Sequence, residues 1–453
     1  MSLKSVSRGS LSEIRATALL ALPLMVGHVC AGLIAFVDNL IAGNHGTDTL
    51  AAVTLGTALL WLPMLVPIGT LIALTASVAR LQGADRTHEI APIFRQALWL
   101  ALFMGLLMFA FLSLVPLLLA PAGIAEQMIP GAQAFLHAVR WGSPALTLFF
   151  CMRYLCEGMH WMRPTMMFSF GGLWVLAPLG YVLTNGKLGF PELGAQGLGI
   201  ASAVMMWLQA SLFAGYLWFG KRLAHLQLFA RFDLPSRAGI MNLLRTGMPI
   251  GIAILMQGSL FIVTSLLIGR LGSTFLAAHQ IAVNLAQLCF MIPVAVAEAT
   301  TVRVGHALGR GDLQRVRQAA WAGCVIVLLT QSVSVVILLL GNEAIASLYS
   351  SDIAVTALAS TLLLFAAALQ FPDGLQMLSA GALRGLQDTR VPMWLAVFCY
   401  WGVGVPLGAG LAFGLEWGPQ GIWTGLITAL SLATLLMGAR FIHSSRVRVT
   451  AIS

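Results

Sequence analysis

The stretch PLMVGHVCAGLIAFVDNLIAGNHGTDTLAA, residues 23–52, returns as PIGIAILMQGSLFIVTSLLIGRLGSTFLAA, residues 249–278. Extended without gaps to residues 23–83 and 249–309, the two segments are identical at 16 of 61 positions with an offset of 226. This offset is close to half of the 453-residue chain, and later segments repeat as well, such as Pro178-Leu179-Gly180 and Pro406-Leu407-Gly408. The chain is therefore predicted to be a duplication of one structural unit, an organisation common among membrane transporters.

The composition of the chain places it in a lipid bilayer. Hydrophobic residues make up 59% of the sequence, charged residues only 9%, and the mean hydropathy is +0.90, whereas a soluble domain carries about 25% charged residues. Apolar runs of about 20 residues predict membrane-spanning helices, because backbone groups in hydrocarbon must be hydrogen-bonded within their own segment. We predict an all-α polytopic membrane protein with twelve transmembrane helices, six in each half, centred near Met25, Pro63, Met108, Phe149, Gly172, Trp207, Gln257, Phe290, Thr330, Phe365, Trp401 and Ala429.

Lysine and arginine residues gather on one side of the predicted spans. Of the 25 basic residues, 22 fall in the N-terminal segment, the even-numbered connections or the C-terminal segment, which leaves Arg140, Lys187 and Arg270 for the other side. Cytoplasmic loops carry such an excess, so both termini are predicted to be cytoplasmic and the two halves to be parallel repeats about an axis along the membrane normal. The net charge of +9 is then an orientation signal and does not indicate a nucleic-acid partner.

The two predicted six-helix lobes are joined by the longest polar stretch of the sequence, residues 220–240 (GKRLAHLQLFARFDLPSRAGI). The predicted domains are an N-lobe over residues 1–219, a cytoplasmic linker over residues 220–240, and a C-lobe with a cytoplasmic C-terminal tail over residues 241–453. The alternation of leucine, phenylalanine and arginine in the linker would also suit a helix that lies in the membrane interface.

The sequence contains no motif for ATP hydrolysis or for metal-dependent catalysis. It lacks the phosphate loop G-x-x-x-x-G-K-[ST] and the zinc motif H-E-x-x-H, and its predicted connections are too short for a soluble nucleotide-binding domain. We therefore expect a transporter rather than an enzyme, without a cofactor or bound metal, and driven by an ion gradient. Coupling to such a gradient usually needs a carboxylate within the membrane that changes its charge.

Two aspartates lie within predicted spans. An ionised carboxylate near the middle of a bilayer costs about 2.5–3.5 kcal/mol, so Asp38 is expected to face a cavity. A broken helix with a nearby carboxylate makes a good cation or proton site, which is expected at Asp373. Asp373 follows Pro372, which frees a backbone carbonyl and kinks a helix. Their repeat partners are Thr264 and Ala145; because the fold does not require an acid at either position, ion coupling is favoured. The alternatives are a hydrated aspartate near the outer surface for Asp38, and a pair with a buried polar group for Asp373.

Further polar residues lie in the eighth span. Glu298 is predicted near its cytoplasmic end, where the side chain would extend to the surface or pair with an arginine such as Arg303; a direct role in transport is the alternative. Helical periodicity predicts one broad polar face, formed by His279, Gln280, Asn284 and Gln287. Such residues can join neighbouring helices, and for His279 this is favoured over proton relay.

Short segments spread along the chain resemble a known family. They are Phe36-Val37-Asp38, Leu276-Ala277-Ala278-His279-Gln280, Val302-Arg303-Val304-Gly305-His306, Pro372-Asp373 and Gly381-Ala382-Leu383-Arg384-Gly385. Their order and spacing are similar to those of the multidrug and toxic compound extrusion (MATE) family, NorM-like branch, over essentially the whole chain. The resemblance implies a V-shaped pair of six-helix lobes that exports organic cations in exchange for H⁺ or Na⁺, with Asp38 as the acid of the N-lobe and Asp373 as the acid of the C-lobe.

The chain departs from the NorM-like pattern at two places. Gln257 stands where the family usually has a glutamate in the seventh span, and Leu176 and Gly180 stand where it shows asparagines in the fifth span. Fewer anionic oxygens weaken a Na⁺ site, because hard cations depend on several oxygen ligands. We therefore expect a drug/H⁺ antiporter in which protonation of Asp38 from outside repacks the first helix and expels the substrate. Further candidates for the ion or substrate path are Asp373, Gln257, His279, Gln280, Asn284 and Glu298.

The expected partners are small cationic drugs or dyes and the lipid bilayer, with the protein acting as a monomer in the bacterial inner membrane. Two alternatives are a Na⁺-coupled drug antiporter and a lipid or oligosaccharide flippase of the same superfamily. A flippase would be expected to have a more cationic cavity for its pyrophosphate headgroup, whereas the intramembrane charges identified in this sequence are acidic.

Overall fold

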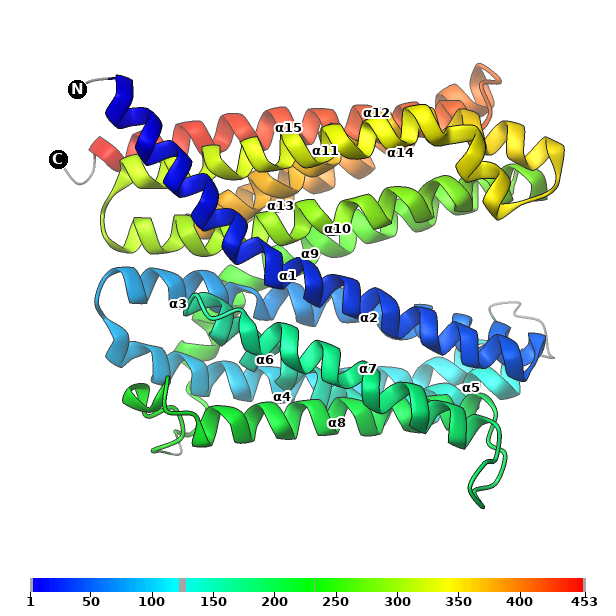
Figure 1. Cartoon of the computed structure of the whole chain (residues 1–453), viewed down its shortest axis with the longest axis horizontal. Coiled ribbons are helices and arrows are strands. Elements are labelled where there is room, and N and C mark those ends of the chain that lie inside the picture. The colour runs from blue at the N-terminus through cyan, green and yellow to red at the C-terminus, as the bar shows by residue number, and fades with distance from the viewer. Residues whose placement is uncertain (1–2, 122–127, 232, 451–453) are drawn as a thin grey trace. The chain divides into compact units, whose positions relative to one another are not determined.

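The computed structural model describes residues 3–121, 128–231 and 233–450. Within these ranges the chain forms helices and short connections and no β-strand, as Figure 1 shows. The prediction of an all-α membrane protein is confirmed. Phe232 of the predicted linker and residues 451–453 of the predicted C-terminal tail lie outside the described residues.

The elements follow one another along the chain with short connections. The first half contains α1 (Leu3–His45), α2 (Thr47–Leu71), α3 (Ala73–Gly83), η1 (Thr87–Glu89), α4 (Ile90–Leu114), η2 (Val115–Leu118), α5 (Ile129–Val139), η3 (Arg140–Gly142), α6 (Ser143–Gly158), α7 (Arg163–Thr184) and α8 (Ala195–Phe219). The second half contains η4 (Ala224–Leu226), α9 (Arg237–Gly269), α10 (Ser273–Gly309), α11 (Leu313–Tyr349), α12 (Ile353–Gly385), α13 (Arg390–Val397), η5 (Phe398–Gly404), α14 (Val405–Ala409), η6 (Gly410–Gly414) and α15 (Pro419–Thr450). The elements η5 and η6 are π-helical, and the other η elements are 3₁₀ turns.

Eleven of the described helical stretches are long and apolar enough to cross a membrane. The remaining predicted span, the fourth, is centred near Phe149 and consists of α5 and α6, which the turn η3 joins. Pro144 lies in the first turn of α6, where a proline is favoured because the first N–H groups of a helix have no partner within it. Each predicted centre lies in a helix, and the twelve-helix, two-lobe layout fits the structure.

The chain divides into two compact units that share two long helices. The N unit comprises Val26–Gly251, and the C unit comprises Met1–Met25 together with Ile252–Ser453. These boundaries differ from the predicted domains because α1 and α9 each contribute residues to both units. The divisions fall two residues after Pro23 and Pro249, which lie inside α1 and α9. A proline inside a helix removes a backbone hydrogen bond and can introduce a bend, and the repeat places such a proline at the equivalent position of α1 and α9.

Glycines allow close helix packing within each unit. A Cβ at Gly105 of α4 would lie 2.5 Å from Cα of Pro144 in α6, and a Cβ at Gly425 of α15 would lie 2.6 Å from the carbonyl oxygen of Gly404 in η5. Both distances are too short for a carbon contact, so these helix pairs need glycine at the crossing. Small residues serve this purpose in membranes, where lipid is as apolar as leucine and close packing contributes much of the association energy.

The linker after α8 is folded against α4 of the N unit. Arg95 Nε lies 2.5 Å from Asp233 Oδ2, and Trp99 Nε1 donates to the Asp233 carbonyl at 2.9 Å. Gln96 Oε1 accepts a hydrogen bond from the Ser236 N–H at 2.7 Å. Within the described part of the linker, the turn η4 is the only helical segment before α9. The described part of the linker therefore forms turns and bends around η4, and not the interfacial helix that its sequence would also suit.

Candidate functional site

A small cavity in the N unit forms where α1, α2, α5, α6, α7 and α8 meet, and its volume is about 90 Å³. Asp38 of α1 lines this cavity and is 8% exposed. Within the residues that the structure describes, Asp38 Oδ1 is buried without a hydrogen-bond partner. Buried polar atoms are usually hydrogen-bonded, so this oxygen can accept a proton or a further donor. The other polar side chains of the cavity wall belong to Thr57, Arg153, Ser169, Ser202 and Gln209.

A buried ion pair on α6 contributes to the wall of the Asp38 cavity. Arg153 Nε lies 2.5 Å from Glu157 Oε1, and the two residues are 6% and 1% exposed. Thr165 Oγ1 donates to the same carboxylate oxygen at 3.3 Å. The guanidinium carbon also lies 5.8 Å from the ring centres of Phe150 and Tyr154, within range of cation–π attraction. Because Glu157 balances the charge of Arg153, the pair does not make the cavity a cationic site.

Sequence reasoning missed Arg153, Glu157 and Gln209. A signal was present for the pair, since an arginine and a glutamate four residues apart in the apolar segment FFCMRYLCEG lie on one helix face. Gln209 of α8 donates to the Phe168 carbonyl of α7 at 2.8 Å. A lone glutamine in an apolar span gives no indication of which helix it contacts, so its place in the cavity wall requires the structure.

The fifth-span positions Leu176 and Gly180 lie on α7 and supply no polar side chain. Leu176 is fully buried. A Cβ at Gly180 would meet Leu198 at 3.0 Å and Ile41 at 3.3 Å, so α7 packs closely against α8 and against α1 one turn beyond Asp38. Apolar contacts occupy this part of the N unit, where the NorM-like pattern has amides.

The second predicted acid lies in the C unit and is hydrogen-bonded. Asp373 of α12 is 6% exposed, and Gln257 of α9 donates from Nε2 to Asp373 Oδ1 at 3.3 Å. The structure thus brings together two predicted residues from separate spans. Pro372 does not interrupt α12, and its carbonyl accepts a hydrogen bond from Thr434 Oγ1 of α15 at 2.8 Å.

Tyr400 is a further polar group near Asp373 that sequence reasoning missed. It is fully buried in the π-helical segment η5, close enough to Asp373 for an electrostatic interaction. Within the described residues its hydroxyl has no hydrogen-bond partner, and the same holds for the indole N–H groups of Trp401 and Trp423. Short π-helical turns are often found at functional sites. The C unit therefore combines a bonded acid with several unpaired buried donors.

The predicted polar face of α10 is divided by the packing of the C unit. His279 is fully buried; its Nε2 lies 3.0 Å from Ser265 Oγ of α9, and its ring meets Trp423 of α15 edge-on at 5.7 Å. Gln280 is exposed and donates to Ser265 Oγ at 3.4 Å, and Asn284 is exposed. His279 therefore joins three helices, whereas Gln280 and Asn284 present amides on the surface of the unit.

Glu298 of α10 is buried, with 6% of its surface exposed. Its side chain therefore does not extend to the surface. Arg303, the nearby arginine expected as a partner, forms an ion pair with Glu13 of α1 instead. Arg384 of the neighbouring helix α12 is also buried, at 4% exposure. Glu298 thus lies among the packed helices of the C unit.

Comparison with known proteins identifies the class to which this duplicated polytopic fold belongs. The MatE family model matches residues 23–182 and 249–409, one segment in each half. The chain is 68% identical to "Probable multidrug resistance protein NorM" of Xanthomonas axonopodis pv. citri, over 99% of this chain and 97% of that protein. It is also 40% identical to "Multidrug resistance protein PmpM" of Pseudomonas aeruginosa, over 96% of this chain and 92% of that protein.

Solved structures agree with this comparison at the level of the fold. The eukaryotic MATE transporter AtDTX14 matches with a TM-score of 0.88 at 17% identity, over 98% of this chain and all of that chain. An outward-facing multidrug resistance MATE family transporter matches with a TM-score of 0.87 at 19% identity, over 97% of this chain and 96% of that chain. The chain belongs to the MatE family, as a NorM-like multidrug efflux transporter embedded in a membrane.

Proposed function

We propose that this transporter exports cationic drugs in exchange for protons that bind Asp38. The observation that carries this proposal is the small N-unit cavity, in which Asp38 Oδ1 has no hydrogen-bond partner among the described residues. A proton needs a single titratable acid, whereas a hard cation needs several oxygen ligands. Leu176, Gly180 and Gln257 each replace a residue that would have supplied an oxygen or a negative charge, which favours H⁺ over Na⁺.

In the proposed cycle, Asp38 alternates between a charged and a neutral carboxyl. The charged form belongs to the state that binds an organic cation. A proton that arrives from outside neutralises Asp38, the part of α1 in the N unit repacks, and the substrate leaves on that side. Loss of the proton to the cytoplasm resets the N unit. Pro23 and Pro249 allow α1 and α9 to change their bend during this cycle, because both helices contribute to both units.

Asp373 has a different role in this proposal. Its carboxylate is held by Gln257, so we assign it to attraction of the cationic substrate rather than to the proton cycle. The exposed amides of Gln280 and Asn284 are assigned to substrate contact at the surface of the C unit. His279 and Glu298 are both buried and are assigned to helix packing.

The proposal includes an orientation, an environment and a working state. The distribution of basic residues supports cytoplasmic termini in a bacterial inner membrane. We expect the protein to work as a monomer that needs no cofactor beyond the coupling ion. Single-cysteine labelling at Lys187 and at Arg310 tests the orientation: only a cysteine at position 187 is expected to react with a membrane-impermeant reagent added outside cells.

Ethidium export by the purified protein in lipid vesicles tests the coupling ion. A gradient that moves H⁺ in the direction opposite to ethidium should drive export. A Na⁺ gradient alone, at matched pH and membrane potential, should not. Asp38→Asn is expected to abolish H⁺-driven export. Asp48→Asn is the matched control, because Asp48 is exposed at the start of α2 and does not line the cavity. Export driven by the Na⁺ gradient alone would contradict the proposal.

A further inference from the structure

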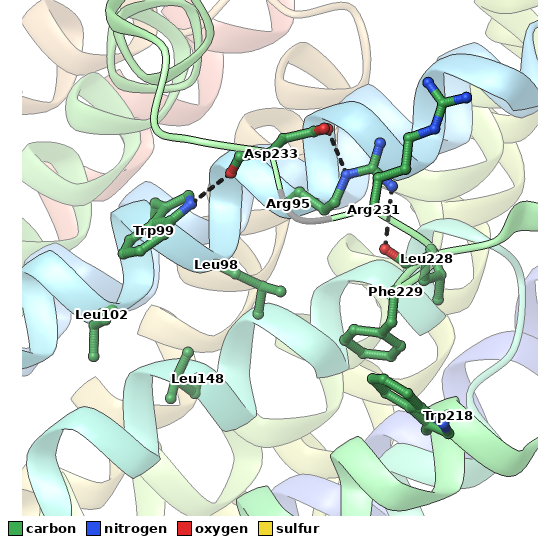
Figure 2. Close-up of a pocket in the computed structure, with 10 residues that line it drawn as sticks. All are labelled: Arg95, Leu98, Trp99, Leu102, Leu148, Trp218, Leu228, Phe229, Arg231 and Asp233. Carbon is green, nitrogen blue, oxygen red and sulfur yellow. Dashed lines mark hydrogen bonds and ion pairs between the residues drawn. The ribbon is translucent and has the colours of Figure 1, made fainter.

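A second cavity of the N unit lies away from Asp38, between the linker and helices α4, α6 and α8. Its volume is about 470 Å³, and Figure 2 shows the residues around it. No wall residue is shared between this cavity and the Asp38 cavity among the residues that the structure describes. The linker segment that closes it is the one that Arg95, Trp99 and Gln96 of α4 hold in place.

One end of this linker cavity is apolar. Leu98 and Leu102 of α4 and Leu148 of α6 line it, together with Phe229 of the linker and Trp218 of α8. The rings of Trp218 and Phe229 are stacked, with centroids 5.2 Å apart. None of these side chains can donate to or accept from a polar ligand except through the indole N–H of Trp218. This end therefore suits a hydrocarbon chain.

The other end of the linker cavity is cationic. Arg95 is neutralised by Asp233 at 2.5 Å and donates to the Leu228 carbonyl at 3.2 Å. Arg231 is exposed and forms no ion pair with another described residue. In Figure 2 its guanidinium points away from Leu102 and Leu148. The uncompensated charge of this cavity is therefore positive, and it lies at the end opposite the leucines.

The surroundings of the linker cavity place it at the surface of a membrane leaflet. Trp218 and Phe219 at the end of α8 are 62% and 84% exposed, and aromatic residues gather where hydrocarbon meets headgroups. Lys221 and Arg222 follow directly and are also exposed. A run of basic residues immediately beyond a membrane span attracts anionic lipid headgroups.

We propose that the linker cavity binds one anionic phospholipid. An acyl chain would lie along Leu98, Leu102 and Leu148, and the phosphate would face Arg231. The apolar end requires a hydrocarbon chain, which free phosphate lacks, and the positive end disfavours an organic cation. A zwitterionic lipid gains less from Arg231 because it carries no net charge. Bound in this way, the lipid would fill the space beneath the linker and stabilise its contacts with α4.

Native mass spectrometry of the full chain, released from nanodiscs that contain equal amounts of phosphatidylglycerol and phosphatidylcholine, tests the proposal. One phosphatidylglycerol is expected to remain bound in preference to phosphatidylcholine. Arg231→Gln is expected to weaken its retention about fivefold, as for loss of one basic residue near an anionic surface. Arg310→Gln is the matched control, because Arg310 is exposed at the end of α10 in the C unit; it should leave retention unchanged. Inorganic phosphate should not displace the lipid.

A photoactivatable phosphatidylglycerol with a diazirine in its acyl chain locates the bound lipid without a mutation. Crosslinks are expected in the peptides that contain Leu98, Leu102 and Leu148. Leu148→Trp, which narrows the apolar end, should remove them, and an unchanged thermal midpoint would show that this variant is folded. Equal retention of the two lipids by the unmodified chain, an equal effect of Arg231→Gln and Arg310→Gln, or crosslinks confined to other helices would overturn the proposal.

Discussion

The two acids of this transporter lie in unlike surroundings although they belong to duplicated units. Asp38 lines a small cavity and leaves one oxygen unbonded among the described residues, whereas Asp373 accepts a hydrogen bond from Gln257. Their repeat partners are Thr264, which bonds its own helix at Phe261, and the fully buried Ala145. The duplication thus preserved the helices while each unit kept its acid at a different position, which supports a division of work between the units.

The helix geometry also differs between the repeats. The fourth span changes to the 3₁₀ turn η3 just before Pro144, whereas its repeat α12 is α-helical through Pro372. In contrast, the fifth span is the single α-helix α7, and its repeat, Arg390–Gly414, contains the π-helical segments η5 and η6. Each unit therefore has a span with mixed helix geometry at a different place, and in the C unit that span carries Tyr400.

The buried charges also differ between α6 and its repeat α12. At the offset of 228 that pairs Pro144 with Pro372, Arg153 and Glu157 correspond to Gly381 and Gly385. Arg153 and Glu157 form a buried ion pair within α6, whereas α12 carries the buried Arg384, at 4% exposure, one position before Gly385. The two units therefore place their buried charges at different positions.

The largest expected effect separates the two acids. Asp38→Asn removes the group that we propose to exchange protons, so H⁺-driven ethidium export should fall to the level of protein-free vesicles. Export by Asp373→Asn should still depend on the pH gradient. The ethidium concentration that gives half of the maximal rate should rise on the order of tenfold, as for loss of one charged hydrogen-bond partner. Initial rates at several ethidium concentrations check both expectations. The same loss of pH dependence in both variants would remove the distinction between the units.

A large effect on stability is expected at the ion pair beside the Asp38 cavity. Arg153→Met leaves the carboxylate of Glu157 buried without its partner, which should lower the free energy of unfolding by about 3–5 kcal/mol. The double variant Arg153→Met with Glu157→Gln should recover most of this loss. Denaturant unfolding in detergent micelles measures all three proteins. If the double variant were no more stable than Arg153→Met alone, the pair would not be the source of the loss.

A moderate effect is expected from a second acid in the C unit. Gln257→Glu places a carboxylate where an amide nitrogen lies 3.3 Å from Asp373 Oδ1. Two carboxylates this close disfavour joint ionisation unless a cation lies between them, so the variant should acquire Na⁺-dependent changes in ethidium binding. Fluorescence titration with and without Na⁺, with Gln257→Ala as the control, checks this. Na⁺ dependence in the unmodified protein as large as in Gln257→Glu would count against our assignment of Gln257.

The smallest effect is expected at Tyr400. Its hydroxyl is buried without a partner among the described residues, and replacing an unpaired polar group by an apolar one of the same shape is nearly neutral or stabilising. Tyr400→Phe should therefore change the free energy of unfolding by less than about 1 kcal/mol. Thermal unfolding of the detergent-solubilised protein measures the change. A loss of several kcal/mol would show that the hydroxyl is bonded through a group such as an ordered water.

Most of the fold could be predicted from the sequence because each span is a continuous apolar run of sufficient length, and because the repeated residues relate the two halves. Apolar runs locate each span, and the shared positions of Pro23 and Pro249 fix the register of the repeat. The 3₁₀ turn η3 beside Pro144 could not be predicted, since Pro372 occupies the repeated position in a helix that stays α-helical. The same residue in the repeated position therefore does not determine the local helix geometry.

The candidate site was only partly predictable for the same reason. A carboxylate in an apolar run is visible in the sequence, so Asp38 and Asp373 could be identified without a structure. The contact from Gln257 to Asp373, and the presence of Arg153 in the Asp38 cavity, depend on how separate helices are placed. His279 shares a predicted polar face with Asn284, yet His279 is buried and Asn284 is exposed. Periodicity locates a face but does not determine which part of it another helix covers.

Proton release on substrate binding tests the central claim most directly. Ethidium is added to the detergent-solubilised protein in a weakly buffered solution with a pH indicator, at a pH low enough for Asp38 to hold its proton. Our account predicts that the unmodified protein and Asp373→Asn release protons as ethidium binds, and that Asp38→Asn binds ethidium without release. Proton release that persists in Asp38→Asn, or its absence from the unmodified protein despite ethidium binding, would contradict exchange at Asp38.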